Sequence, residues 1–140
     1  MFRIYTIGYE GTTQPDLIAA LNAAGVKRLI DVRAVPLSRK PGFSKDILAN
    51  GLAEAGIDYA HLKALGTPPE GREAARKGRH DELARKLDLP GAIVAAQQML
   101  DLAHEKPSAV LSFERDPATC HRSLLLAAVA SEAEVIDLFA

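Results

Sequence analysis

The sequence predicts an α/β fold: a three-layer, Rossmann-like sandwich around a mainly parallel sheet of about five strands. Short apolar runs typical of strands alternate with longer segments in which apolar residues recur at helical spacing. Strands joined by a helix form right-handed βαβ units, so a parallel sheet is expected. At 140 residues, 48% of them hydrophobic and 25% charged, the chain is predicted to form one domain over residues 1–140.

The first element is an apolar, β-branched strand at residues 2–7, followed by a turn that contains two glycines. Thr13 is the expected N-cap of the helix that follows, with Asp16 in a capping-box position. Gly25 is the expected end of that helix. Residues 26–32 then form the second strand, a nearly continuous apolar run.

A loop at residues 33–43 follows the second strand. It holds two prolines and one glycine, and it is longer than the usual connection between a strand and a helix. Ser44 is the expected cap of the next helix, which should end at Gly56. A short third strand is predicted at residues 57–60.

Residues 62–89 are predicted to be an exposed helical excursion, or a lid. Residues 70–88 contain six basic and five acidic side chains, several of them at i,i+4 spacing, which is usual for a solvated helix face. The remaining predicted elements are a helix at 90–105, a strand at 109–113, a helix at 120–130 and a strand at 135–139.

Composition limits the classes of partner. The net charge of −1 gives no reason to expect nucleic acid, although a local basic patch could still bind a nucleic-acid end. The single cysteine fits a reducing compartment, and the N-terminus lacks the pattern of a signal peptide. No apolar run is long enough for a membrane span. The sequence therefore predicts a cytoplasmic protein without a membrane partner.

The predicted site lies at the carboxyl ends of the strands, because ligands of open parallel sheets bind there. Ionisable and small residues follow each strand in turn. The predicted ligand-binding residues are Gly8, Tyr9, Asp31, Arg33, Ser38, Arg39, Arg115 and Arg122, and the predicted catalytic residues are Glu114, Glu10, His121 and Cys120.

A small anion is the predicted ligand. Residues 33–45 contain four basic residues and no acidic one. Arginine presents a fork of donors suited to phosphate, and the start of the helix at Cys120 adds free N–H groups. In the alternative interpretation Arg33 pairs with Asp31 or Glu114 as a structural ion pair, while Arg39 and Lys40 are only solvated. For Lys40 and Lys45 the solvated interpretation is favoured.

Cys120 is open to two interpretations. At the start of a helix beside Arg122 its thiol is in the setting of a nucleophile. A buried cysteine that acts as a small hydrophobic residue at a helix start is the more usual case. His121 could serve as a base, but neighbours in sequence rarely point the same way on a helix.

Glu114, at the end of the fourth strand, could be a general base or could pair with an arginine as a structural strut. Glu10, in the first turn, is the other candidate acid or base. A metal site that combines Glu114 with His61, His121 and Cys120 has no supporting ligand spacing, so no metal is predicted.

Several motifs together resemble one family, domain of unknown function family 488. These are Thr6–Gly11, Asp31-Val32-Arg33 with Pro36, Ser38-Arg39 and Gly42–Ser44, Gly56–Tyr59, Leu65-Gly66, and Glu114 with Cys120-His121-Arg122. The resemblance implies a compact α/β domain with a shared pocket at the strand ends and no settled activity. Members often carry a second cysteine where this chain has Ser112, so a mechanism that needs two cysteines is not expected here.

Three functions remain open. The first is binding, and processing, of a phosphate-bearing ligand such as a nucleotide or a nucleic-acid end, with a carboxylate as acid or base. The second is a non-catalytic interaction or structural module. The third is thiol chemistry at Cys120, as in rhodanese-like sulfurtransferases or cysteine phosphatases. The residues alone name no cofactor and no oligomeric state.

Overall fold

The computed structural model describes residues 3–33, 38, 41–62, 90–113 and 134–139. The predicted helix at 120–130 and the predicted excursion beyond Leu62 lie outside the described residues. None of the helices in the described ranges is long and apolar enough to span a bilayer. The elements are β1 (Arg3–Gly8), α1 (Gln14–Ala23), β2 (Arg28–Asp31), α2 (Lys45–Glu54), β3 (Asp58–His61), α5 (Pro90–Glu105), β4 (Ser108–Ser112) and β5 (Glu134–Leu138).

The strands form one sheet in the order β3-β2-β4-β1-β5, and every pairing in it is parallel. The predicted α/β class with about five parallel strands is confirmed. The observed strand boundaries lie within two residues of the predicted ones. The shift is largest for β2, where Lys27 and Arg28 bond through their N–H groups to the carbonyl of Pro107 before regular pairing begins.

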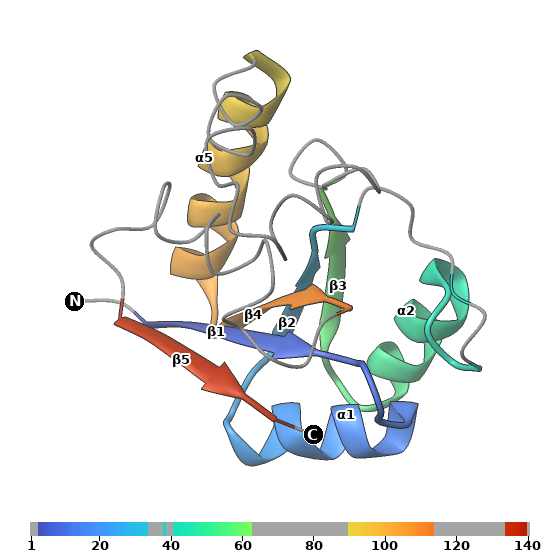
Figure 1. Ribbon diagram of the computed structural model, residues 1–140. Coiled ribbons are helices and arrows are strands. Elements are labelled where there is room, and N and C mark those ends of the chain that lie inside the picture. Colours follow the sequence, from blue (N-terminus) through green and yellow to red (C-terminus); the bar gives the residue numbers. More distant parts are fainter. Residues whose placement is uncertain (1–2, 34–37, 39–40, 63–89, 114–133, 140) are drawn as a thin grey trace, which may run out of the picture.

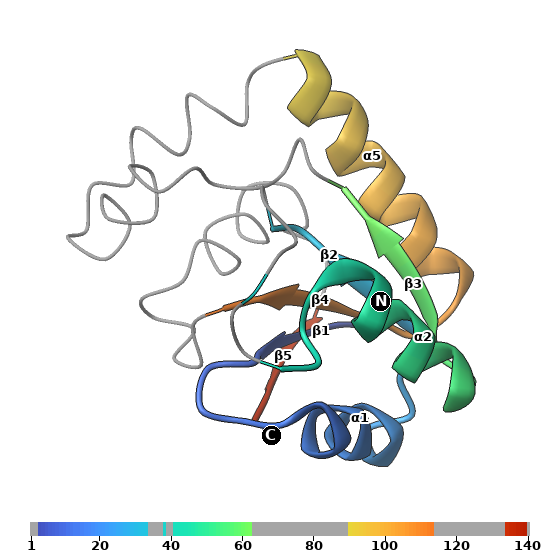
Figure 2. The same ribbon diagram turned by 90° about the vertical axis from the view of Figure 1, so that its right-hand side faces the viewer.

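The elements stack in three layers, with α5 on one face of the sheet and α1 and α2 on the other (Figures 1 and 2). This follows from the strand order, because right-handed connections that run in opposite directions along a sheet lie on opposite faces. Side-chain alternation divides the core in the same way. On β1, Ile4 packs in the cluster with Met99 of α5, whereas Ile7 packs in the cluster with Leu17 of α1 and Leu48 of α2.

Two helices end with the same glycine motif. Gly25 after α1 and Gly56 after α2 have φ values of +78° and +77°, a conformation that glycine adopts at little cost. After α1, Val26 donates to the carbonyl of Leu21 at 3.0 Å, and the equivalent bond after α2 measures 2.9 Å. These are Schellman caps, each of which turns the chain from its helix toward the next strand. The predicted helix ends are confirmed.

The N-caps differ from each other. Thr13 accepts a hydrogen bond from the backbone N–H of Asp16 at 3.3 Å, as its position predicts. Ser44 occupies the N-cap position of α2, but its side chain makes no capping bond and instead contacts Ser38. The hydroxyl of Ser44 thus holds the preceding loop rather than the helix.

Gln14 at the start of α1 is hydrogen-bonded to the start of α2. Its side-chain amide donates to the carbonyl of Gly42 at 2.7 Å and to that of Ile47 at 3.3 Å. Its Oε1 occupies the space where a Cβ on Gly51 would lie. A glycine in the middle of α2 is otherwise unfavourable, so close approach of Gln14 explains its presence.

We predict strong coupling between Gln14 and Gly51. Gly51→Ala should displace the Gln14 amide, which then loses its hydrogen bonds to Gly42 and Ile47. This loss should offset the gain of about 1 kcal/mol that alanine brings in helix propensity. In a Gln14→Ala background the same substitution should be stabilising. Urea unfolding of the four proteins of this double-mutant cycle should give a coupling of about 1–2 kcal/mol. Additive effects would contradict the proposed steric conflict.

Candidate functional site

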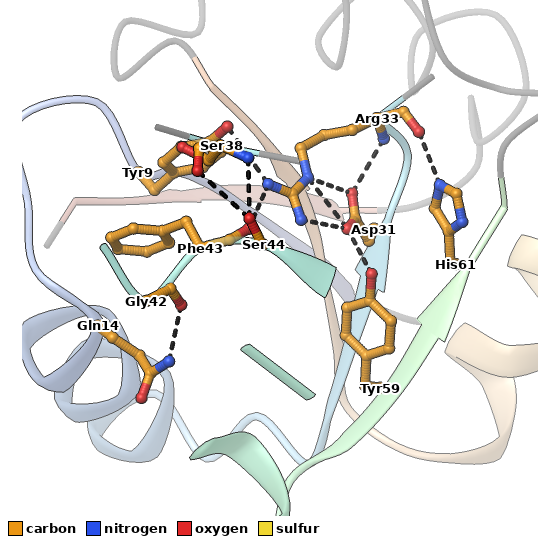
Figure 3. Close-up of polar contacts among 10 residues, drawn as sticks. All are labelled: Tyr9, Gln14, Asp31, Arg33, Ser38, Gly42, Phe43, Ser44, Tyr59 and His61. Atoms are coloured by element: carbon orange, nitrogen blue, oxygen red, sulfur yellow. Dashed lines mark hydrogen bonds and ion pairs between the residues drawn. The ribbon is translucent and has the colours of Figure 1, made fainter. Parts of the chain in front are cut away.

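A buried ion pair lies at the carboxyl end of β2. Asp31 is fully buried and Arg33 is 6% exposed. β2 lies next to β4, where the sheet order reverses: β1, β2 and β3 progress toward one edge, and β4 then inserts between β2 and β1. Such a reversal is the usual position of a ligand crevice in open parallel sheets. Figure 3 shows the side chains that gather there.

The two charges are joined in several ways. Arg33 Nη2 lies 2.7 Å from Asp31 Oδ2, and Nε lies 2.9 Å from Oδ1 and 3.0 Å from Oδ2. The backbone N–H of Arg33 also donates to Oδ1, at 3.0 Å. Although burial acts to lower the pKa of Arg33, the hydrogen bond and charge of Asp31 raise it, so the guanidinium stays protonated. Both partners are therefore charged and mutually neutralised.

Tyr59 of β3 adds a further donor to the same carboxylate. Its hydroxyl lies 2.5 Å from Asp31 Oδ2. Burial of the phenol raises the pKa of Tyr59, and so do the hydrogen bond and negative charge of Asp31. Tyr59 therefore remains a hydrogen-bond donor well into the alkaline range.

The other side of the Arg33 guanidinium holds two distant segments. Nη1 donates to the carbonyl of Phe43 at 2.7 Å and to the hydroxyl of Tyr9 at 3.3 Å. The ring of Tyr9 stacks on Phe43 with centroids 4.7 Å apart and meets Phe113 edge to face at 5.3 Å. Tyr9 and Phe43 are buried, so these rings belong to the core and have no open face on which a ligand base could stack.

His61 of the edge strand β3 contacts the backbone of Arg33, whereas Ser38 lies on the other side, beside Tyr9 and Ser44 (Figure 3). His61 Nε2 lies 2.7 Å from the carbonyl oxygen of Arg33, which can only accept, so this nitrogen carries the proton. The hydroxyl of Ser44 accepts from the N–H of Ser38 at 3.1 Å. The bonds from Arg33 to Phe43 and from Ser38 to Ser44 thus join the described residues at the two ends of the loop at 33–43.

The start of α1 is poorly suited to an anion. Pro15 lacks an N–H, the hydroxyl of Thr13 already accepts from the N–H of Asp16, and the carboxylate of Asp16 adds negative charge. A helix start attracts anions only through free N–H groups and its positive end. The start of α1 therefore gives no support to an anion site there.

The predicted site residues fall into three groups. The structure joins Tyr9, Asp31 and Arg33 in one hydrogen-bonded network. Ser38, Gly8 and Glu10 are described but bond elsewhere, and Ser38 bonds to Ser44. Gly8 pairs with Ser112 at the end of β1, and Glu10 is exposed, with its N–H donating to the carbonyl of Phe113. The predicted residues that lie outside the described ranges are Arg39, Glu114, Arg115, Cys120, His121 and Arg122.

Neither Tyr59 nor His61 is among the predicted site residues, although His61 is weighed as a metal ligand. The two lie two positions apart on β3 and so on one face, opposite the end of β2. Strand alternation and parallel register therefore place them near Asp31. Phe43 takes part through its backbone carbonyl, for which the sequence carries no signal. No group of three potential metal ligands occurs among the described residues.

A family model described as "Domain of unknown function DUF488" matches residues 14–129, which is most of the chain. The matched range includes Asp31, Arg33, Phe43 and Tyr59, whereas β1 and Tyr9 precede it. No curated protein and no solved structure matches the chain.

We predict that Asp31→Asn is severely destabilising, because it leaves the Arg33 charge buried without a counter-ion. The expected loss in urea unfolding is about 3–5 kcal/mol. Glu134→Gln is the matched control: it removes the partner of Arg3 from an ion pair with exposed side chains, and it should cost less than about 1 kcal/mol. Adding Arg33→Met to Asp31→Asn should recover part of the loss. Equal effects of the two single substitutions would contradict a structural role for the buried pair.

We predict that the stabilising effect of Tyr59 disappears at high pH. Because the pKa of Tyr59 is higher in the folded chain than the value of about 10 in the unfolded chain, its contribution is complete below pH 10 and falls above it. At pH 8 the free energy of unfolding of the wild type should exceed that of Tyr59→Phe by about 1 kcal/mol. Above pH 10 this difference in free energy should shrink by less than about 1.4 kcal/mol per pH unit, because solvent screens the partly buried phenol. Unfolding curves between pH 8 and 11 test this, and a constant gap would refute it.

Proposed function

The chain belongs to the DUF488 family, and from this membership and the geometry of the strand ends we propose that it binds a small phosphate-bearing ligand. The ligand would be a nucleotide or a nucleic-acid end, seated outside the carboxyl ends of β2 and β4. The family description gives no activity, so the proposal depends on the site itself.

The observation that carries the proposal is the buried Asp31–Arg33 pair at the reversal of the strand order. Arg33 donates to the carbonyl of Phe43, and Ser44 accepts from Ser38, so the described residues at the two ends of the loop between β2 and α2 are bonded to each other. That loop contributes Arg39 and Lys40, and the chain after β4 contributes Arg115 and Arg122. Loop ends held at one place would reduce the entropy lost when basic side chains of the loop close on an anion.

Arg33 itself is a poor primary contact for phosphate, because Asp31 neutralises it. The ligand's charge would instead be met by Arg39, Arg115 and Arg122, each able to donate a fork of hydrogen bonds. If the ligand is also processed, Glu114 or Glu10 would act as acid or base, with His121 and Cys120 as further candidates. A single cysteine suits the reducing cytoplasm, which we propose as the compartment.

A second candidate function, a non-catalytic module, is favoured by a specific observation. The hydrogen bonds of Arg33 described above are all accepted by other groups of the protein. This is expected of an arginine that holds a surface in place for a protein partner. Strong destabilisation by Asp31→Asn together with no ligand response would favour this candidate.

Pyrophosphate, ADP and a 5′-phosphorylated oligonucleotide are suitable probes for thermal-shift and calorimetric titration. A probe at a concentration about ten times its Kd should raise Tm by about 3–6 °C. Arg39→Ala and Arg122→Ala should each weaken binding about tenfold or more, since each loses a charged hydrogen bond. Arg3→Ala, at the opposite end of the sheet, is the control and should bind as wild type. No shift with any probe, or an equal loss in the Arg3→Ala control, would refute phosphate binding at this edge.

A further inference from the structure

A separate cavity of about 530 Å³ lies at the amino edge of the sheet, at the opposite end from the Asp31–Arg33 pair. Its volume falls within the range of small-molecule sites. The C-terminal end of α5 leads into β4 here, next to the start of β1 (Figure 1). The lining residues are Arg3, Tyr5, Ala103, His104, Glu105, Lys106 and Pro107. We propose that this cavity binds a small organic carboxylate through Arg3, at a site distinct from the proposed phosphate site.

The carbonyl oxygens and the Glu105 carboxylate at this end of α5 already accept hydrogen bonds from the protein. Arg28, 8% exposed, donates from Nη1 to the carbonyl of Leu102 at 2.9 Å and from Nη2 to Glu105 Oε1 at 2.9 Å. The hydroxyl of Ser108 donates to the carbonyl of Lys106 at 2.9 Å. The helix end and the Glu105 carboxylate therefore have donors of their own, which reduces their repulsion of an incoming anion.

Lys106 is also committed to a partner. Its Nζ lies 2.6 Å from Asp58 Oδ2. This hydrogen bond, reinforced by the positive charge of Lys106, lowers the pKa of Asp58 and keeps the pair charged. Lys106 is thus not the cation that would recognise a ligand.

Arg3 is the cation that remains accessible. Its Nε lies 3.3 Å from Glu134 Oε2, and the two side chains are 63% and 48% exposed. An ion pair this exposed contributes little, so a ligand can compete with Glu134. Among the residues that the structure describes, neither Nη group of Arg3 has a hydrogen-bond partner. Two free Nη groups can hold both oxygens of a carboxylate.

The rest of the wall favours an organic ligand over a bare inorganic anion. The partly buried ring of Tyr5 and the apolar side chains of Ala103 and Pro107 line the cavity beside Arg3. Apolar contact beside one oriented charge is the usual composition of a small-molecule site. A planar carboxylate fits this combination.

Benzoate is the probe, with neutral benzamide as its isostere, each titrated into ¹⁵N-labelled protein and followed by NMR. Benzoate should produce saturable shifts in the amides of residues 5 and 103–106, with a Kd of about 1 mM for a ligand of this size. Benzamide should bind at least tenfold more weakly. Arg3→Gln should weaken benzoate at least fivefold, whereas the exposed Lys45→Gln at the other end of the sheet should leave its affinity unchanged.

Glu134→Gln tests the proposal by an expected gain of affinity, because Glu134 is not a lining residue of the cavity. It removes the carboxylate that competes for Arg3, so benzoate should bind at least twofold more tightly. Equal affinities for benzoate and benzamide, an unchanged affinity in Arg3→Gln or in Glu134→Gln, or shifts confined to residues 31–33 would overturn the proposal. Absence of phosphate binding at the carboxyl edge would not affect it, because the two sites share no residue.

Discussion

The Asp31–Arg33 pair is the interaction on which the carboxyl edge of this protein depends. It connects the end of β2 with Tyr59 of β3, with the carbonyl of Phe43 before α2, and with the hydroxyl of Tyr9 after β1. Two buried charges are costly unless each is paired and hydrogen-bonded. Both side chains are paired and hydrogen-bonded here only because the end of β2, β3, the residue before α2 and the residue after β1 meet. The charges therefore require these four segments to adopt one arrangement.

This constraint changes how a ligand site at that edge can work. An arginine neutralised by a buried aspartate supplies rigidity rather than net positive charge, and the buried rings of Tyr9 and Phe43 supply packing rather than a stacking surface. The proposed anion site would therefore depend on basic side chains other than Arg33. The amino edge has arginines of both kinds. Arg28 is buried and paired there, as Arg33 is at the carboxyl edge, whereas Arg3 is largely exposed and only weakly paired.

Much of the fold could be predicted from local patterns. Gly25 and Gly56 each follow an apolar helical run, and both adopt the positive φ that such a position needs. Thr13 caps α1 because only its neighbours in sequence are required. Ser44 has the same local signal, yet its hydroxyl bonds to Ser38. A local rule fails there because a competing partner six residues away is brought within reach by the loop.

By itself the sequence determined the order of the described helices and strands, the parallel sheet, and the edge at which Asp31 and Arg33 would lie. These follow from periodicity, glycine stops and connection rules, all of which act over short stretches of chain. Only the tertiary structure decided that Arg33 is turned inward onto Asp31, and that Tyr59 and the carbonyl of Phe43 complete its surroundings. The reason is physical: an arginine at a strand end can face solvent or the core with the same local backbone. Burial and partners from other strands make that choice.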